Sequence, residues 1–169
     1  FGYDNFQPQY GPDGNGALII GTAAGDGLFG TVSSDTIEGR DGSDSLHGNA
    51  GNDVLSGEAG NDSLQGDAGN DSLYGGLGND SFSDALGANV MDGGEGSDVF
   101  SGVGSGSGID TLTGGSGRDY YYLSWNQGSA LDIVTDFATG VGGDVIDISY
   151  VGGVYLGGEN PFLRGYLRL

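Results

Sequence analysis

The sequence contains no cysteine and no lysine, and only three prolines and one histidine occur among its 169 residues. Without cysteine, the chain has neither a disulfide framework nor a thiolate nucleophile. No apolar run reaches roughly 18 residues, so the sequence predicts no membrane-spanning helix. Basic residues are also scarce: four arginines stand against 24 acidic residues. The net charge of −20 disfavours nucleic acids, anionic lipid surfaces and polyanionic glycans as partners.

Glycine, by contrast, is abundant, with 39 residues in the chain. Because glycine costs roughly 1 kcal/mol relative to alanine inside a helix, this composition argues against long helices. The negative charge opposes compaction through self-repulsion. The chain is therefore either disordered or neutralised by bound cations, and its regular apolar period favours the second interpretation.

Residues 48–83 consist of four copies of one nine-residue motif: GNAGNDVLS, GEAGNDSLQ, GDAGNDSLY and GGLGNDSFS. Each copy has glycine at its first and fourth positions, aspartate at its sixth and a large apolar residue at its eighth. The same frame extends over residues 21–122 as eleven copies, of which one is degenerate and one is stretched by three extra residues at 102–104. The glycines permit tight turns. The last three positions alternate outward, inward and outward, as in a short strand.

Two copies are predicted to make one coil of a flattened spiral with two parallel sheets packed back to back. The eighth-position residues then form inward rows that include Leu46, Leu55, Leu64 and Leu73, and the sixth-position residues stack along two edges. Edge one consists of Asp26, Asp44, Asp62, Asp80, Asp98 and Asp119. Edge two consists of Asp35, Asp53, Asp71, Asn89 and Asp110.

The stacked aspartates predict a bound cation. If they served only as turn residues, asparagine and aspartate would exchange freely, yet the sixth position is aspartate in ten of eleven copies. Bare carboxylates at one-coil spacing repel each other and resist ionising together. Carboxylates and turn carbonyls form an oxygen-only ligand set, which selects Ca²⁺ over zinc or copper, whereas Mg²⁺ gives up its water reluctantly.

The nonapeptide G-G-x-G-x-D-x-U-x over residues 21–122 resembles the RTX (repeats-in-toxin, hemolysin-type calcium-binding) family. The resemblance implies an all-β fold, the right-handed parallel β-roll, with roughly five to nine Ca²⁺ ions between turns of copies n and n+2. The earlier turn contributes its Asp and the carbonyls of its second and fourth residues. The later turn contributes its Asp and the carbonyls of its first and third residues. The metal-site residues implied in this way are Asp26, Asp35, Arg40, Gly42, Asp44, Asn49, Gly51, Asp53, Gly57, Glu58, Ala59, Gly60, Asp62, Gly66, Ala68, Asp71, Gly75, Gly76, Leu77, Gly78, Asp80, Gly93, Glu95, Asp98, Gly114, Ser116 and Asp119.

Departures from the motif predict unequal edges. Asn89 is a neutral residue in edge two, so we expect weak or missing calcium beside it. The first two copies lack the fourth-position glycine, having Ala24 and Ser33 instead, so the motif defines their sites less completely.

Residues 1–20 are predicted to be a lead-in that covers the open N-terminal end of the stack, with a first strand at 17–20. A partner-binding role for the aromatic residues in this segment is the alternative; they are Phe1, Tyr3, Phe6 and Tyr10.

Residues 123–169 are predicted to form a β-rich cap, with longer strands at 132–137 and 144–149. This segment resembles the one that follows RTX repeats, recognised by Asp136-Phe137 and Asp147-Ile148-Ser149. Tyr120, Tyr121, Tyr122 and Trp125 would plug the core, or alternatively offer a sugar-stacking platform. Asp136, Asp144 and Asp147 are either ligands of a further ion or solvated turn acids.

The tail at 160–169 is similar to C-terminal regions of proteins exported by type I secretion. Such regions usually continue further, so we expect truncation at Leu169. The start at Phe1, without Met or a leader, suggests a piece of a longer polypeptide.

Together these features predict a secreted or cell-surface calcium-binding module that folds on Ca²⁺ after export. Its expected partners are calcium, the remainder of the polypeptide and the type I secretion machinery. Catalysis has little support, because His47 occupies an outward strand position and the acids are committed to the repeat. The alternatives are a surface-layer or adhesin module that associates with copies of itself, and a targeting or stabilising module of a secreted enzyme.

Overall fold

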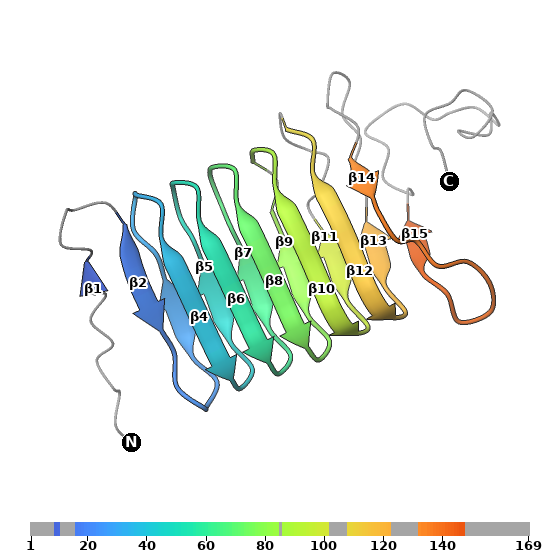
Figure 1. Cartoon of the computed structure of the whole chain (residues 1–169), viewed down its shortest axis with the longest axis horizontal. Coiled ribbons are helices and arrows are strands. Elements are labelled where there is room, and N and C mark those ends of the chain that lie inside the picture. Colours follow the sequence, from blue (N-terminus) through green and yellow to red (C-terminus); the bar gives the residue numbers. More distant parts are fainter. Residues whose placement is uncertain (1–8, 11–15, 85, 102–107, 123–131, 148–169) are drawn as a thin grey trace.

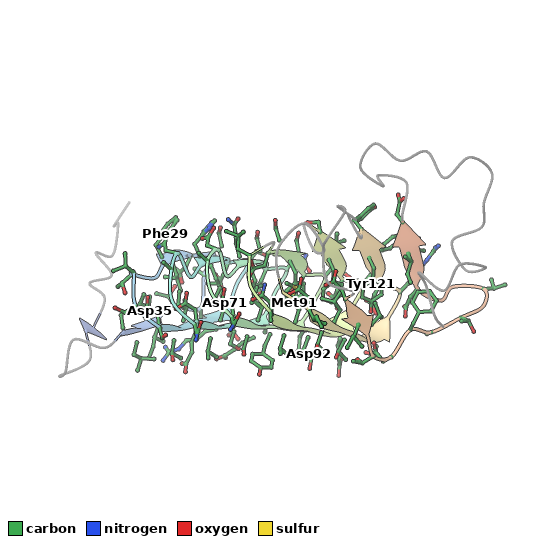
Figure 2. The ribbon with its side chains drawn as sticks, turned by 90° about the horizontal axis from the view of Figure 1, so that it is seen from above. Phe29, Asp35, Asp71, Met91, Asp92 and Tyr121 are labelled. Carbon is green, nitrogen blue, oxygen red and sulfur yellow. The ribbon has the colours of Figure 1, made fainter. Side chains whose placement is uncertain are left out.

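The computed structural model describes residues 9–10, 16–84, 86–101, 108–122 and 132–147, which form strands and turns. Two sheets lie face to face (Figures 1 and 2). The eight-stranded sheet has the order β1 (Gln9–Tyr10), β2 (Ala17–Ile20), β4 (Thr36–Asp41), β6 (Val54–Ala59), β8 (Ser72–Leu77), β10 (Val90–Gly96), β12 (Thr111–Gly117) and β14 (Ile133–Val134). The seven-stranded sheet has the order β15 (Val145–Asp147), β13 (Tyr120–Tyr122), β11 (Val99–Ser101), β9 (Ser81–Ser83), β7 (Ser63–Gln65), β5 (Ser45–His47) and β3 (Gly27–Phe29). Among these residues no helix is long and apolar enough to cross a membrane.

From β2 onward, successive strands alternate between the two sheets, so the chain winds as a flattened coil (Figure 1). Within a sheet, Leu46 pairs with Leu64, and Leu64 pairs with Phe82, each 18 residues further along. Two nine-residue copies therefore make one coil, which confirms the prediction. The pairing of β1 with β2 is antiparallel, and the other described pairs are parallel.

The core between the sheets is built from the eighth-position residues. From the second copy onward these side chains are fully buried, because the alternation within each three-residue strand segment turns its middle side chain toward the opposite sheet. In Figure 2, Met91 lies between the two layers, whereas Phe29 and Asp92 lie outside them. Phe82, Phe100 and Tyr121 stack with ring centroids 4.8 and 4.9 Å apart, close to the spacing of neighbouring strands.

The two sheets differ in strand length, which the sequence does not predict. Three-residue strands are found in the seven-stranded sheet, but β4, β6 and β8 have six residues each. Pairing there continues into the following turn, where Arg40 pairs with Glu58 in left-handed backbone conformations (φ 78° and 71°). On the opposite edge, pairing in the turn is reduced to isolated bridges from Ala50 to Ala68 and from Ala68 to Leu86.

At the C-terminal end, β14 and β15 add one strand to each sheet. β14 is shorter than the strand predicted at 132–137, because the Asp136 side chain accepts hydrogen bonds from Gly114 and Gly115 where β14 was expected to continue. β15 begins one residue after the predicted start at 144. Of the three tyrosines predicted to plug the core, Tyr121 is fully buried, whereas Tyr122 is 45% exposed. It points outward because it is the ninth-position residue of its copy.

At the N-terminal end, the strand predicted at 17–20 is confirmed as β2, which pairs with β4, although the short β1 precedes it. Some predictions concern residues outside the described ranges. These are the aromatic residues Phe1, Tyr3 and Phe6, the insertion at 102–104, Trp125, the end of the segment at 144–149, and the tail at 160–169.

Replacing Leu64 with alanine tests the core. Leu64→Ala removes a fully buried side chain and is expected to lower the free energy of unfolding by about 2–5 kcal/mol. Val54→Ala, at an outward position that is 41% exposed, should change it by only about 0.5 kcal/mol. Urea unfolding in millimolar calcium measures both. Equal losses in the two variants would contradict the inward assignment of Leu64.

Candidate metal centre

The sixth-position aspartates form two hydrogen-bonded ladders, one along each edge. In edge one, for example, the Asp44 amide donates to Asp62 Oδ1 and the Asp62 amide donates to Asp80 Oδ1, both at 2.8 Å. In edge two, the Asp53 amide donates to Asp71 Oδ1 at 2.7 Å. The side chains beyond Asp26 are buried, with at most 3% exposed. The structure thus brings the predicted acidic residues together in the two predicted rows.

The second oxygen of most of these carboxylates has no hydrogen-bond partner although it is buried. The first two copies differ, because Thr22 donates to Asp26 and Thr31 donates to Asp35 from within the same turn. Those two carboxylates are therefore already satisfied by the protein. The buried, unpartnered oxygens are Oδ2 of Asp44, Asp53, Asp62, Asp71, Asp80, Asp84, Asp98 and Asp119.

Apart from that of Asp84, each unpartnered oxygen faces the first-position glycine of its own copy. A Cβ on Gly57 would lie 2.3 Å from Asp62 Oδ2 and 2.8 Å from the carbonyl oxygen of Gly75 in the next coil. The same pair of oxygens, one carboxylate and one carbonyl, converges at Gly39, Gly48, Gly75 and Gly93. The first position must therefore be glycine wherever this convergence is kept, since any side chain would fill the space between the two oxygens.

Carbonyl oxygens of the second and fourth positions also point toward the next coil. Glu58 O lies 2.1 Å from where a Cβ on Gly76 would be, and Gly60 O lies 1.5 Å from the same point on Gly78. The implied third-position ligands are different, because the carbonyls of four of them already accept backbone amide hydrogen bonds. These residues are Ala59, Ala68, Leu77 and Glu95. Ser116 pairs with Glu95 in the register of β10 and β12.

Within the described residues no three acidic, histidine or cysteine side chains converge on a common metal position. Each turn instead supplies two carboxylates from successive coils, together with backbone carbonyls. Orphaned carboxylate oxygens facing carbonyl oxygens form the hard, flexible, oxygen-only donor set that suits Ca²⁺. The residues present therefore fit calcium, and the complete ligand set of each ion remains a prediction.

Burial and mutual repulsion govern the titration of these carboxylates. Desolvation is the main cause that raises the pKa of Asp53 and Asp62 to about 6 and that of Asp98 to about 7. A backbone amide lowers each pKa in part, and neighbouring carboxylates raise it further. In the metal-free fold these groups therefore hold protons that exposed carboxyl groups would have lost.

A parallel two-sheet coil with carboxylate and carbonyl oxygens gathered in its turns defines a cation-binding β-roll. A family profile described as the RTX calcium-binding nonapeptide repeat (4 copies) matches residues 20–55, 29–64, 47–82, 82–103 and 105–125. These matches cover more than half of the chain, which therefore belongs to the RTX calcium-binding repeat family. No curated protein was found to match the chain.

Three further acidic residues lie in the turns outside the predicted nonapeptide ligands, and for one of them, Asp144, the sequence left a further ion site and a solvated turn acid open. Asp132 Oδ1 accepts from the Asp110 amide at 3.1 Å, and Asp144 Oδ1 accepts from the Asp119 amide at 3.0 Å, so both edges continue past the nonapeptides. A signal was present in each case, because Asp-Ile-Val and Asp-Val-Ile repeat the order of sixth to eighth positions. The third residue, Asp84, occupies a first position and had no such signal.

A pH titration of the calcium-free chain tests the buried carboxylates. Their folded pKa values lie above the ordinary value of 3.8, so they favour the fold fully below that value and lose this contribution as pH rises through about 6 to 7. In chelator, lowering the pH from about 7.5 to about 4.5 should increase β-structure in circular dichroism. An identical spectrum at both values would contradict the assignment.

A methyl group at Gly57 tests the convergence of oxygens. Gly57→Ala should lower calcium affinity at the turn of Asp62 at least tenfold, or about 1.4 kcal/mol, because the new Cβ occupies the space between Asp62 Oδ2 and Gly75 O. Gly27→Ala is the matched control, since its nearest neighbour would be a Phe29 ring carbon at 3.9 Å. Isothermal titration calorimetry compares the two, and indistinguishable titrations would contradict the proposed ligand position.

Proposed function

We propose that the chain is a calcium-driven folding module of a larger extracellular protein, exported unfolded by type I secretion and folded outside the cell. The observation that carries the proposal is the row of buried carboxylate oxygens without hydrogen-bond partners along each edge. Leaving such charges buried and unpaired is strongly unfavourable. The calcium-free fold is thus poorly stable at neutral pH.

The net charge of −20 acts in the same direction. Where calcium is scarce, repulsion among the acids keeps the chain expanded and able to pass through an export channel. Where calcium is abundant, binding stabilises the folded state by mass action, because paired turns exist only in that state. Asp44, Asp62 and Asp80 of edge one, and Asp53 and Asp71 of edge two, would hold ions together with the turn carbonyls.

The stack geometry supports folding from one end. Each coil pairs with its immediate neighbours, as the strand order of both sheets illustrates. In such an arrangement structure propagates from coil to coil once one pair of turns has bound its ion. A chain that emerges gradually from a channel can therefore fold progressively.

A non-catalytic role agrees with the surroundings of the single histidine. The His47 ring stacks on Phe29 at 5.0 Å between centroids, and its Nδ1 lies 3.9 Å from Asp67 Oδ2. These contacts occur on the outer face of the seven-stranded sheet, where His47 and Phe29 are paired neighbours. We assign His47 to stacking between adjacent strands.

Circular dichroism of the full chain tests the proposal. In chelator at neutral pH the spectrum should be that of a disordered chain, and millimolar calcium should convert it to a β spectrum with a cooperative thermal transition. Equimolar magnesium is the control and should not produce the conversion, because Mg²⁺ demands near-octahedral geometry. A chain that is fully folded in chelator would refute calcium-driven folding.

A further inference from the structure

Copy 84–92 departs from the repeat at two positions that have opposite effects on charge. Asn89 replaces the sixth-position aspartate, which removes a carboxylate. Asp84 replaces the first-position glycine, which adds one. The other first positions that the structure describes are all glycine: Gly21, Gly30, Gly39, Gly48, Gly57, Gly66, Gly75, Gly93 and Gly114.

Asn89 keeps its place in edge two but contributes no charge. Its Oδ1 accepts from the Asp71 amide at 2.9 Å, as an aspartate oxygen does in the other coils. Its Nδ2 takes the position of the second oxygen and has no hydrogen-bond partner. With Asn89 alone, the turn shared with Asp71 would contain one carboxylate, whereas the turn shared by Asp53 and Asp71 contains two.

The Asp84 side chain points into the turn that has lost the charge. It is 2% exposed; Oδ1 accepts from the Leu86 amide at 3.3 Å, and Oδ2 has no partner. A Cβ on Gly66 would lie 2.2 Å from Asp84 Oδ2 and 2.5 Å from Asp71 Oδ2. Two buried, unpartnered carboxylate oxygens from successive coils thus converge on one point.

The position reached by Asp84 Oδ2 is a ligand position in the other coils. At Gly48 the equivalent point lies 2.4 Å from Asp53 Oδ2 and 2.6 Å from the carbonyl oxygen of Gly66. At Gly57 and Gly75 a carboxylate and a first-position carbonyl converge in the same way. At Gly66 the two oxygens nearest to that point are both carboxylate oxygens, those of Asp84 and Asp71, rather than one carboxylate and one carbonyl oxygen.

We propose that Asp84 is a calcium ligand outside the nonapeptide pattern, which with Asp71 restores to this turn the two carboxylates that Asn89 would otherwise reduce to one. Edge two therefore keeps an ion between the coils of Asp71 and Asn89, with a ligand set unlike that of its neighbours. Ca²⁺ suits this turn because it accepts irregular oxygen geometry, whereas Mg²⁺ does not. This replaces, for the Asp71 side of Asn89, the expectation of a weak site.

The two departures depend on each other. An aspartate at both positions 84 and 89 would place three carboxylates in one buried turn with Asp71, which like-charge repulsion disfavours. The amide of Asn89 avoids that repulsion and keeps the hydrogen bond to the Asp71 amide. The carboxylate has in effect moved from the sixth position to the first.

Counting bound ions in the full chain tests the proposal. Asp84→Asn and Asp84→Gly should each bind one Ca²⁺ fewer than the natural chain in equilibrium dialysis, or bind that ion at least tenfold more weakly. The double variant Asp84→Gly, Asn89→Asp restores the regular motif and should restore the count. Asp41→Asn, which removes the same charge from an exposed side chain, is the matched control and should leave the count unchanged.

An unchanged count in Asp84→Asn would overturn the proposal and indicate that Asp84 and Asp71 share a proton. If Asp84→Asn does not fold, anomalous diffraction from the natural chain with Tb³⁺ decides. A peak within about 2.6 Å of both Asp84 and Asp71 carboxylate oxygens supports the site, and its absence overturns it. The inference rests on calcium binding by the repeats, so failure of the natural chain to bind calcium would refute the proposed function as well. If the natural chain binds calcium and the Asp84→Asn variant binds the same number of ions, only the inference is refuted.

Discussion

The two regular coils, that of Asp44 with Asp53 and that of Asp62 with Asp71, each bury two carboxylates, one on each edge, and the protein gives a hydrogen-bond partner to only one oxygen of each. One oxygen accepts a hydrogen bond from a backbone amide of the preceding coil, and this bond holds neighbouring coils together. The other oxygen faces a glycine and a carbonyl and finds no donor. First-position glycines and the carbonyls of the turns are arranged around that second oxygen. The apolar core is therefore fully packed, whereas the buried carboxylates still need a cation to balance their charge.

A second ladder at the neighbouring position shows why charge is needed. Asn52 Oδ1 accepts from the Asn70 amide at 2.9 Å, and Asn61 Oδ1 accepts from the Asn79 amide at 2.7 Å, both at exposed fifth positions. A neutral amide is thus sufficient to join successive coils by a hydrogen bond. Because the buried sixth position uses a carboxylate for the same hydrogen bond, the carboxylate must serve another purpose, and binding a cation is the purpose that its unpartnered oxygen supports.

The frame of the fold could be predicted because a nine-residue period gives both the inward row and the two edges. Leu64 is buried, and the Asp62 amide donates a hydrogen bond to the Asp80 carboxylate one coil further on, as that period requires. The period did not place Asp132 or Asp144 in the two edges, because they lie 22 and 25 residues after their partners, where a fixed period does not find them. Asp84 escaped because its role depends on where a first-position side chain points, which no spacing reveals.

These exceptions define what the architecture requires. The coil repeats after 18 residues in the regular part, yet after 21 at Asp110 and at Asp119, and the same amide-to-carboxylate hydrogen bond forms each time. The strands on either side of the extra residues keep their parallel pairing. The essential unit is therefore an acidic residue two positions before an inward apolar residue, placed in register with the preceding coil. Since the number of residues per coil can vary, the location of the charge can vary too, provided that each turn keeps enough carboxylate to hold its ion. Copy 84–92, with its carboxylate at the first position, is the case in this chain where that freedom is used.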